Sequence, residues 1–249
     1  MNLRGKKVVV TGGVKGLGRS MVDSLVAHEC LVTVFDIDVS GFSSLKDMHP
    51  RIQCVACDVS DYDQVSAATE SYFAEHGAPN VLINNAGILY SEPLIKITES
   101  GLQKHDPLTW DRVLRINLSS VFYLTSCVVE KMVATRTKGV IVNISSVSAG
   151  GNAGASAYSA TKAAVNSLTQ SWARELGPMG IRVVAVAPGF MDTDSASAAM
   201  SEAALRETIK RVPLRRLGKT EEVAEAVLAV ITNEFFNGKV LELDGGLIV

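Results

Sequence analysis

The sequence lacks an excess of charge of either sign. Its 249 residues include 24 lysines and arginines against 26 aspartates and glutamates, a formal net charge of −2. That balance provides no basic field for nucleic acid or for an anionic membrane. No apolar run approaches the roughly 18 residues of a membrane span, and the start MNLRGKKVVVTGG lacks the long apolar region of a signal peptide. We therefore expect a cytoplasmic protein without nucleic-acid or membrane partners.

The sequence also lacks residue spacings that are typical of metal sites. Two of its four cysteines, Cys54 and Cys57, form a C-x-x-C pattern, but the pattern lies in an apolar run that we interpret as a strand. A reactive thiol would need a helix start or a second cysteine pair. We predict no metal site and interpret the cysteines as reduced, small, buried side chains. The four histidines are scattered: His28, His49, His76 and His105.

Short apolar runs alternate with longer amphipathic segments along the whole chain. This alternation is typical of an α/β protein in which helices cover both faces of a parallel sheet. The runs are rich in Val and Ile without strict alternation, which indicates strands buried on both faces. No linker or repeat interrupts residues 1–249, so we expect one domain. The predicted strands are Lys7–Thr11, Leu31–Asp36, Ile52–Cys57, Val81–Asn84, Val140–Ser145, Arg182–Ala187 and Val240–Leu243.

The first predicted strand runs into a glycine-rich turn, Thr11–Gly18, and then into a helical pattern. Glycines at such a turn let a pyrophosphate approach backbone N–H groups at a helix N-terminus. The spacing is G-x-x-x-G-x-G rather than the commoner G-x-G-x-x-G, and an ordinary glycine-rich turn is the alternative. Its position directly after the first strand favours a phosphate site.

Asp36 ends the second predicted strand, eighteen residues after Gly18. A carboxylate there can accept hydrogen bonds from an adenine-ribose diol and would repel a 2′-phosphate. A solvated carboxylate at a strand end is the alternative interpretation. Lys15 in the glycine loop could instead pair with a 2′-phosphate. The position of Asp36 favours NAD(H) over NADP(H) as the cofactor.

Three further polar positions have two interpretations each. Asp58 can bond an adenine amino group or cap the helix that begins near Tyr62. Asn84–Gly87 can brace neighbouring loops beside a ligand or form a simple turn. Asn117 lies among apolar residues inside a predicted helix, where it makes a core hydrogen bond or marks a helix irregularity that holds a water.

Tyr158 and Lys162 are four residues apart and share one face if their segment is helical. An ammonium there favours the phenolate and lowers the tyrosine pKa from its usual value of about 10. A tyrosine of this kind can pass a proton at neutral pH. Ser145 and Ser146 end the fifth predicted strand and can donate to a carbonyl oxygen in front of Tyr158.

Two longer segments lie beside this chemistry. About residues 88–107 form a long connection. We interpret it as part of the entrance to the substrate site or as part of a contact between subunits. About residues 191–212 are rich in Ala and Ser and predict a mobile substrate lid. The lid is mostly small and apolar, which indicates a modest hydrophobic substrate, and Arg206, Lys210 and Arg211 near its end indicate a distant acidic group on that substrate.

Together these features resemble the short-chain dehydrogenase/reductase family over essentially the whole chain. Its subgroup of bacterial 3-oxoacyl-[acyl-carrier-protein] reductases is the most similar, through PGFMDTD, LRRLGKTEEVAEAV and the DGG near the end. The matching motifs are T-G-x-x-x-G-x-G at Thr11–Gly18, Asp58, N-N-A-G at Asn84–Gly87, Asn117, the serine before the loop, Y-x-x-x-K at Tyr158 and Lys162, and P-G-x-x-x-T at Pro188–Thr193.

The resemblance implies a three-layer Rossmann fold with seven mostly parallel strands in the order 3-2-1-4-5-6-7. It implies an NAD(P)(H)-dependent oxidoreductase of secondary alcohols and ketones that forms a homotetramer or dimer. Tyr158 would be the general acid/base, Lys162 would lower its pKa and hold the nicotinamide ribose, and Asn117 would anchor a proton-relay water. The implied cofactor-binding residues are Gly12, Lys15, Gly16, Leu17, Gly18, Asp36, Asp58, Val59, Asn85, Ala86, Gly87, Tyr158, Lys162, Pro188, Gly189 and Thr193.

The catalytic serine requires a choice between neighbours. The usual family spacing, thirteen residues before the tyrosine, leads to Ser145, whereas alignment of the strand end N-I-S-S selects Ser146. Strand ends fix a side chain better than loop lengths do, and strand alternation puts the two hydroxyls on opposite faces. We choose Ser146.

Two features depart from the reductase subgroup. The connection 88–107 is longer than usual there, and most such reductases use NADPH, whereas Asp36 favours NAD(H). Both departures point to an NAD-linked dehydrogenase of a specialised alcohol. A 3-oxoacyl-[acyl-carrier-protein] reductase that uses NADPH is the alternative, and a non-catalytic dinucleotide-sensing regulator is a remote one.

Overall fold

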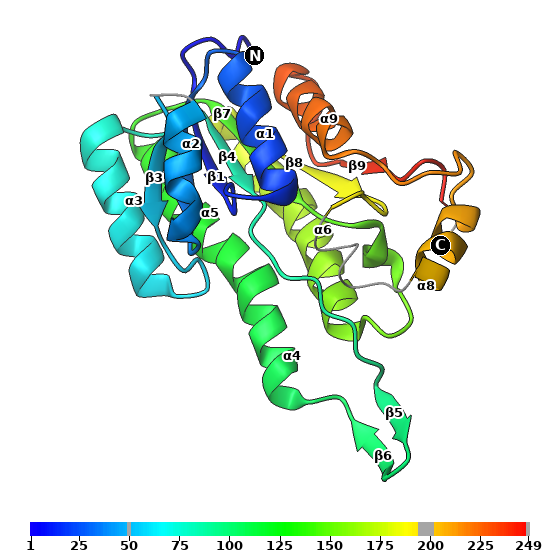
Figure 1. The fold of residues 1–249 in the computed structure, drawn as a ribbon. Helices are drawn as coiled ribbons and strands as arrows, with labels where there is room; N and C mark the ends of the chain where they lie inside the picture. The colour runs from blue at the N-terminus through cyan, green and yellow to red at the C-terminus, as the bar shows by residue number, and fades with distance from the viewer. Residues whose placement is uncertain (49–50, 194–201, 248–249) are drawn as a thin grey trace.

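A computed structural model describes residues 1–48, 51–193 and 202–247. Its central feature is a seven-stranded sheet in the order β3-β2-β1-β4-β7-β8-β9, in which every neighbouring pair is parallel (Figure 1). The predicted Rossmann order is confirmed, because β7, β8 and β9 are the fifth to seventh strands of this sheet. The strands are β1 Lys7–Thr11, β2 Leu31–Asp36, β3 Gln53–Ala56, β4 Val81–Asn84, β7 Gly139–Ile144, β8 Ile181–Pro188 and β9 Val240–Leu243.

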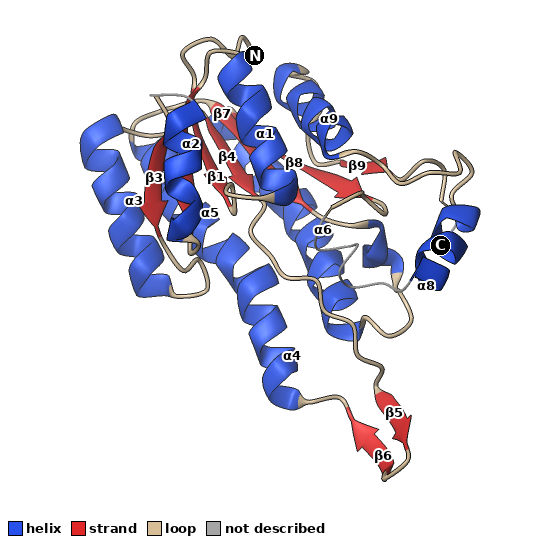
Figure 2. Ribbon diagram, viewed as in Figure 1, coloured by secondary structure: helices blue, strands red, loops and turns tan. Residues whose placement is uncertain are grey.

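Helices cover both faces of the sheet and make three layers (Figure 2). One face packs against α1 (Gly16–Ala27), α2 (Phe42–Met48) and α9 (Thr220–Thr232). The other packs against α3 (Tyr62–His76), α5 (Ser120–Ala134) and α6 (Ser156–Leu176). The remaining helices are α4 (Pro107–Leu114), α8 (Glu202–Arg211), the 3-10 turns Val39–Gly41, Val147–Gly150 and Gly177–Met179, and the π-helical turn Arg115–Ser119.

Each central strand contributes to two hydrophobic cores, because successive side chains point to opposite faces of a sheet. In β1, Val8 and Val10 belong to the core under α1 and α9, whereas Val9 belongs to the core under α3, α5 and α6. All three side chains are almost fully buried. This two-sided burial explains why the strands appear in the sequence as unbroken apolar runs.

A chain of polar side chains crosses the buried middle of the sheet. Asn84 on β4 donates from Nδ2 to Thr125 Oγ1 on α5 and to Asn143 Oδ1 on β7, both at 2.9 Å. Asn143 in turn donates to Thr169 Oγ1 on α6 at 2.9 Å. The chain therefore joins two strands of the sheet to the two long helices on one face. Sequence analysis singled out Asn84 but missed Asn143, which lies in an otherwise apolar run.

The long connection after β4 contains two strands that the sequence analysis did not predict. Residues Ile95–Thr98 (β5) and Gly101–Lys104 (β6) form an antiparallel hairpin that projects from the body of the protein (Figure 1). Ile97 is 84% exposed and faces Leu102, which is 73% exposed, across the hairpin. The alternation Ile-Lys-Ile-Thr was the available signal, but a strand with no buried face lacks the apolar run that marked the others.

One helical stretch in the described part of the chain, Pro107–Ala134, is long and apolar enough to cross a membrane by length and composition alone. It comprises α4, the π-helical turn and α5. Its second half packs on α3 and β4 and buries Leu124, Val128 and Met132 in the core. Burial against the sheet therefore accounts for part of its apolar composition.

Replacement of Asn84 by alanine tests the buried polar chain. The change leaves the Asn143 amide oxygen buried without its donor, so we expect the free energy of unfolding to fall by about 3 kcal/mol. Urea unfolding measures this loss, with Asn2→Ala, a change at an exposed asparagine, as the control. A loss no larger in Asn84→Ala than in the control would contradict a structural role for the chain.

Candidate active site

The glycine loop after β1 is shaped by backbone requirements that only glycine meets. Gly12 and Gly16 have φ values of +64° and +57°, a region that favours glycine. A Cβ on Gly12 would lie 2.9 Å from Ala86 Cα, and one on Gly18 would lie 1.9 Å from the Gly12 carbonyl oxygen. A Cβ on Gly16 would meet nothing within 4 Å. The loop is therefore packed on its inner side and open at Gly16, next to the N-terminus of α1, as a phosphate cradle requires.

The N-N-A-G segment braces this loop, as predicted. Asn85 Nδ2 donates to the carbonyl oxygens of Thr11 at 3.0 Å and Gly12 at 2.9 Å. Thr11 Oγ1 accepts from the backbone N–H groups of Asn85 and Ala86, both at 3.0 Å. These four bonds hold the end of β4 against the end of β1. The interpretation of the segment as a simple turn is therefore wrong.

Asp36 is a buried brace rather than a solvated carboxylate. Its Oδ2 accepts from Val14 N at 3.0 Å and its Oδ1 from Asp38 N at 2.9 Å, and the residue is only 9% exposed. Lys15 is exposed, and its Nζ lies 3.6 Å from a carboxylate oxygen of Asp38. Asp38, which sequence analysis missed, therefore supplies the partner of the lysine. Leu17 packs partly against the core below the loop.

Asp58 does not cap α3, which corrects one of its two interpretations. The capping residue is Asp61, whose side chain accepts from the N–H groups of Asp63 and Gln64. The N-cap lies directly before the first helical residue, and α3 begins at Tyr62. Asp58 instead accepts from the N–H and hydroxyl of Ser60 at 2.9 Å and 2.7 Å. Its neighbour Val59 is buried in the core.

Asn117 lies in the π-helical turn Arg115–Ser119, so the predicted helix irregularity is present. Its Oδ1 accepts from Ile88 N and its Nδ2 donates to Ile88 O, both at 2.8 Å. The core hydrogen bonds of the alternative interpretation are therefore present as well. Isolated π-helical turns inside α-helices are frequent at functional sites. Gly87 is close by, where a Cβ would lie 3.1 Å from Asn117 Oδ1.

Tyr158 and Lys162 lie in the first two turns of α6, where Lys162 is buried and Tyr158 is half-buried. Lys162 Nζ is 5.6 Å from the centroid of the Tyr158 ring and donates to the Ile144 carbonyl oxygen at 2.7 Å. Burial raises the pKa of Tyr158, and a hydrogen bond with Ser146 offsets part of that rise. Burial lowers the pKa of Lys162 to about 8. The expected lowering of the tyrosine pKa by the ammonium is therefore not found, because desolvation of the phenolate outweighs it.

The two candidate serines point to different neighbours. Ser145 Oγ is buried and donates to the Lys162 carbonyl oxygen at 3.3 Å, against the backbone of α6. Ser146 Oγ accepts from Ser148 N at 3.1 Å, and its hydroxyl lies near enough to Tyr158 to lower the pKa of that phenol. Of the two hydroxyls, that of Ser146 lies beside the tyrosine. This arrangement favours the choice of Ser146.

The P-G-x-x-x-T segment closes the site on the side of β8. Pro188 is the last residue of β8, and Gly189 N donates to the Leu243 carbonyl oxygen at 2.8 Å. A Cβ on Gly189 would lie 2.8 Å from Asp244 Cα, so the glycine allows this approach. Thr193 and Gly16 line one hollow of about 540 Å³ between α1 and α9, which brings this segment next to the glycine loop.

The predicted lid is described only in part. Residues 194–201 lie outside the described residues. The portion Glu202–Arg211 is the helix α8, in which Arg206 pairs with Glu202 at 3.4 Å and Lys210 pairs with Glu207 at 2.7 Å. The basic residues predicted near the lid therefore lie on an exposed helix with ion pairs of its own.

Two of the four cysteines are buried as predicted, whereas Cys54 and Cys127 are only half-buried. All four are free. Cys30 and Cys57 are buried, and burial raises the pKa of each thiol to about 11. Such thiols remain protonated and unreactive at neutral pH. Within the described ranges, no group of three or more His, Cys, Asp or Glu side chains is arranged to hold a metal ion.

Comparison with known proteins agrees with this geometry. A model described as short chain dehydrogenase matches residues 6–204. The chain belongs to the short-chain dehydrogenase family. Like other members of the family, it is an oxidoreductase that acts on CH–OH groups with NAD or NADP.

Several relatives that match the chain over nearly its whole length are named 3-oxoacyl-[acyl-carrier-protein] reductase. A 3-oxoacyl-[acyl-carrier-protein] reductase FabG from Thermotoga maritima is 35% identical over 256 residues, covering 100% of both chains. Proteins of the same name from Chlamydia muridarum and Salmonella typhimurium are 34% and 32% identical, covering 97% and 99% of both chains respectively. The resemblance to the reductase subgroup is therefore confirmed.

The buried lysine predicts how stability depends on pH. The pKa of Lys162 falls from 10.5 to about 8 on folding, so between these values the unfolded chain binds a proton that the folded chain does not. Stability therefore rises with pH across this window, by about 3 kcal/mol if the shift is fully expressed. In Lys162→Met this contribution is absent.

Denaturant unfolding at pH 8 and at pH 10.5 measures the effect as the difference between wild type and Lys162→Met. We expect the free energy of unfolding of the wild type to increase, relative to that of Lys162→Met, as the pH rises. Lys96→Met, at an exposed position of the hairpin, is the matched control and should show no such trend. A trend of the opposite sign would contradict a desolvated lysine.

Proposed function

We propose that the chain interconverts a secondary alcohol and a ketone by hydride transfer, with Tyr158 as the general acid/base. The observation that carries this proposal is the position of the buried Lys162 ammonium, 5.6 Å from the centroid of the Tyr158 ring, with the Ser146 hydroxyl near enough to lower the pKa of that phenol. The nicotinamide of the bound dinucleotide supplies or accepts the hydride. Ser146 donates to the substrate oxygen, and Tyr158 gives that oxygen a proton in reduction and takes it back in oxidation.

The protonation of Tyr158 favours reduction as the starting direction. Because burial raises its pKa, the phenol keeps its proton at neutral pH and is ready to donate it. For oxidation the phenol must first lose that proton. The neighbouring Lys162 ammonium lowers the free-energy cost of forming the negatively charged phenolate. Asn117, fixed by Ile88 on the π-helical turn, is proposed to anchor the water through which the proton exchanges with solvent.

For the cofactor we propose NAD(H) rather than NADP(H). Asp36 places a buried negative charge at the carboxyl end of β2, where an adenine ribose would lie in this fold. A 2′-phosphate would be repelled by that carboxylate. Lys15, the cation able to offset this repulsion, lies 3.6 Å from Asp38. We also propose that Asp58 and Val59 contact the adenine of the cofactor, and that Thr193 and Gly189 lie near its nicotinamide half.

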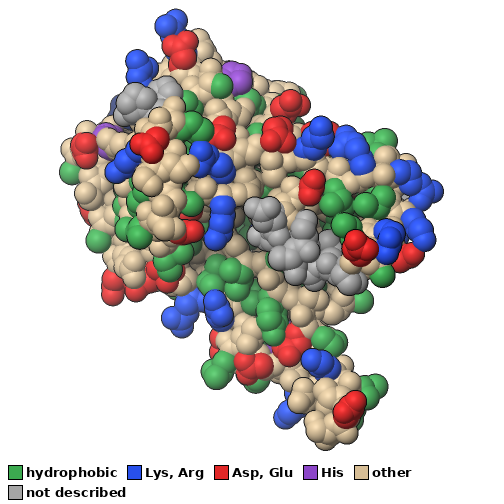
Figure 3. Space-filling view, in the orientation of Figure 1, with side chains coloured by type: hydrophobic (Ala, Val, Ile, Leu, Met, Phe, Trp, Pro, Cys, Tyr) green, Lys and Arg blue, Asp and Glu red, His purple; other side chains and the backbone are tan. Residues whose placement is uncertain are grey.

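The substrate class follows from the relatives and the surface. Because relatives that cover the whole chain are named 3-oxoacyl-[acyl-carrier-protein] reductases, we propose a 3-oxoacyl thioester as the first candidate. Lys and Arg side chains gather on the surface over α8 (Figure 3), where Arg206, Lys210 and Arg211 are exposed. They suit an acidic group distant from the ketone. A specialised alcohol is the second candidate, favoured by the extra hairpin.

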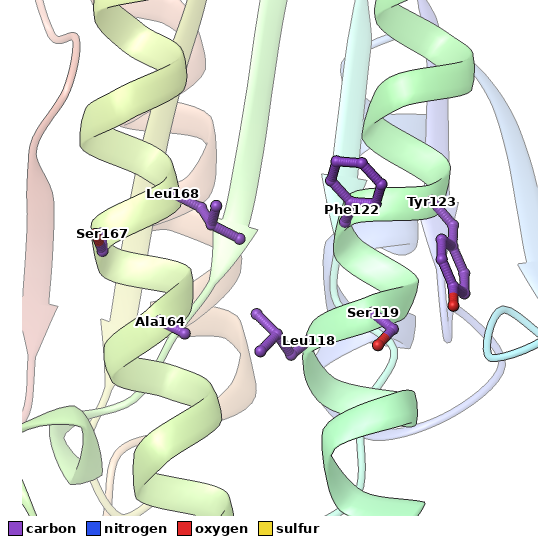
Figure 4. A pocket seen from close by; sticks show the side chains of 7 residues that line it. All are labelled: Leu118, Ser119, Phe122, Tyr123, Ala164, Ser167 and Leu168. Atoms are coloured by element: carbon purple, nitrogen blue, oxygen red, sulfur yellow. The ribbon is translucent and has the colours of Figure 1, made fainter. Parts of the chain in front are cut away.

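We also propose a homotetramer or dimer, formed through α5 and α6. A hollow of about 400 Å³ opens between these helices (Figure 4). Its lining is mostly apolar and includes Leu118, Phe122 and Leu168, of which Phe122 is 53% exposed. A second copy of the same face would cover these side chains.

The free cysteines suit the reducing cytoplasm in which we place the protein.

A non-catalytic dinucleotide sensor is disfavoured. Such a protein would be expected to have lost members of the catalytic constellation. Here Asn117, Ser146, Tyr158 and Lys162 are all present, and both Lys162 and Ser146 lie beside Tyr158.

Replacement of Tyr158 by phenylalanine tests the mechanism. We expect kcat for a ketone panel that includes an acetoacetyl thioester to fall by about a thousandfold, because the proton donor is lost. The Kd for NADH, measured by fluorescence titration, should stay within about twofold of wild type. Tyr62→Phe, at an exposed tyrosine, is the control and should retain full turnover.

The serine assignment is tested in the same assay. Ser146→Ala should lose far more turnover than Ser145→Ala, because the hydroxyl of Ser146 is the one beside Tyr158. Full activity in Tyr158→Phe would refute the mechanism. Loss of turnover in Ser145→Ala alone would reverse the serine assignment.

A further inference from the structure

Residues Ile88–Glu92, which we call the strap, connect the end of β4 to the hairpin. One end of the strap holds Asn117. The backbone N–H and carbonyl groups of Ile88 bond both ends of the Asn117 amide at 2.8 Å. The orientation of this amide on its π-helical turn therefore depends on where the strap lies.

The other end of the strap holds the start of α6. Ser91 Oγ donates to the Gly154 carbonyl oxygen at 2.9 Å, and Glu92 pairs with Ala155 in a parallel β-bridge. Ala155 is the N-cap residue of α6, whose start has no side-chain cap. Its carbonyl oxygen accepts an early hydrogen bond of the helix, from Ser159 N at 2.8 Å. The strap therefore lies against the residue directly before α6, three residues before Tyr158.

Hydrogen bonds to the Glu92 carboxylate hold the Glu92 end of the strap in place. Its Oε2 accepts from the Tyr90 hydroxyl at 2.9 Å and from Asp106 N at 3.3 Å. His105 Nδ1 lies 3.5 Å from the same oxygen and 3.2 Å from the Glu92 carbonyl oxygen. Glu92 therefore ties the strap to the residues that follow the hairpin. The hairpin closes at the same point, because His105 N donates to Leu94 O at 3.0 Å.

His105 shows that this junction is specifically built. Its side chain is only 8% exposed and lies edge-on to the rings of Tyr90 and Trp110, at centroid distances of 5.9 Å and 6.2 Å. Its Nε2 is buried and makes no hydrogen bond within the described residues. An unsatisfied buried ring nitrogen costs stability. The ring is nevertheless held with its other nitrogen toward Glu92.

We propose that Glu92 is a positioning residue for the reaction. Through the strap it sets the place of Tyr158 at the start of α6 relative to Asn117 on the π-helical turn. The inference rests on the proposed function, in which these two side chains act in one proton path. It assigns a role to the hairpin segment as well, because the two ends of the hairpin meet at Glu92.

Glu92→Ala tests the proposal through turnover and through a readout that needs no turnover. We expect kcat to fall about tenfold or more, because small misplacement of reacting groups is costly, while the Kd for NADH stays within about twofold. Amide hydrogen exchange in residues 154–162 should become about tenfold faster, because the bridge to Ala155 is loosened. Glu92→Gln keeps an acceptor for the Tyr90 hydroxyl and should recover most of both properties. Lys96→Ala, in the exposed strand β5, is the matched control and should leave both unchanged.

Each outcome has a defined meaning. Wild-type kcat in Glu92→Ala, or unchanged exchange in residues 154–162, would overturn the proposal. A lower Tm with unchanged kcat would overturn it too, because Glu92 would then only keep the hairpin folded. Faster exchange in Glu92→Ala would support the hold of the strap on α6 even if the wild type turned over no ketone, and that absence of turnover would count against the proposed function alone.

Discussion

The hydrogen bond between the Asn84 and Asn143 side chains, at 2.9 Å in the buried middle of the sheet, fixes the two strands on which the site depends. These residues are register partners in the parallel pair β4 and β7. Directly after Asn84 come the residues that brace the glycine loop, and shortly after Asn143 come the two serines. Because both strands run parallel, their carboxyl ends meet at one edge of the sheet. The glycine loop and Ser146 are thereby placed at the same edge of the sheet.

Burial sets the chemistry at that edge. Desolvation raises the pKa of Tyr158 and lowers that of Lys162, and so drives both groups toward their neutral forms. The ammonium bonds the carbonyl of Ile144, the last residue of β7, and is fixed there rather than at the phenol. A site built in this way starts with a proton on the tyrosine, which suits the reduction of a carbonyl.

The parts of the fold that carry apolar burial were readable from the sequence. Four of the seven sheet strands have the predicted bounds, and the Gln53–Ala56 strand is one residue shorter at each end than predicted. The β5–β6 hairpin was missed because Ile95 and Ile97 face solvent and leave no continuous apolar run.

Asp58 was offered as a cap because the start of α3 could not be fixed to one residue. The direction of the tyrosine pKa shift was wrong, since spacing shows that a lysine is near but not how much water both groups lose. The strap could not be foreseen, because its contacts with Asn117 and with Gly154 join residues 29 and 63 positions apart.

Deuterium transfer from [4-²H]NADH to an acetoacetyl thioester tests the central claim, that this edge of the sheet carries out hydride transfer from NADH to a ketone. The pro-R and pro-S labelled cofactors are each supplied to the wild-type protein, and the mass of the hydroxyacyl product is measured. The account predicts a product one mass unit heavier with one of the two labels, and faster formation with NADH than with NADPH. Product that carries no deuterium from either label, or the absence of any product, would contradict it.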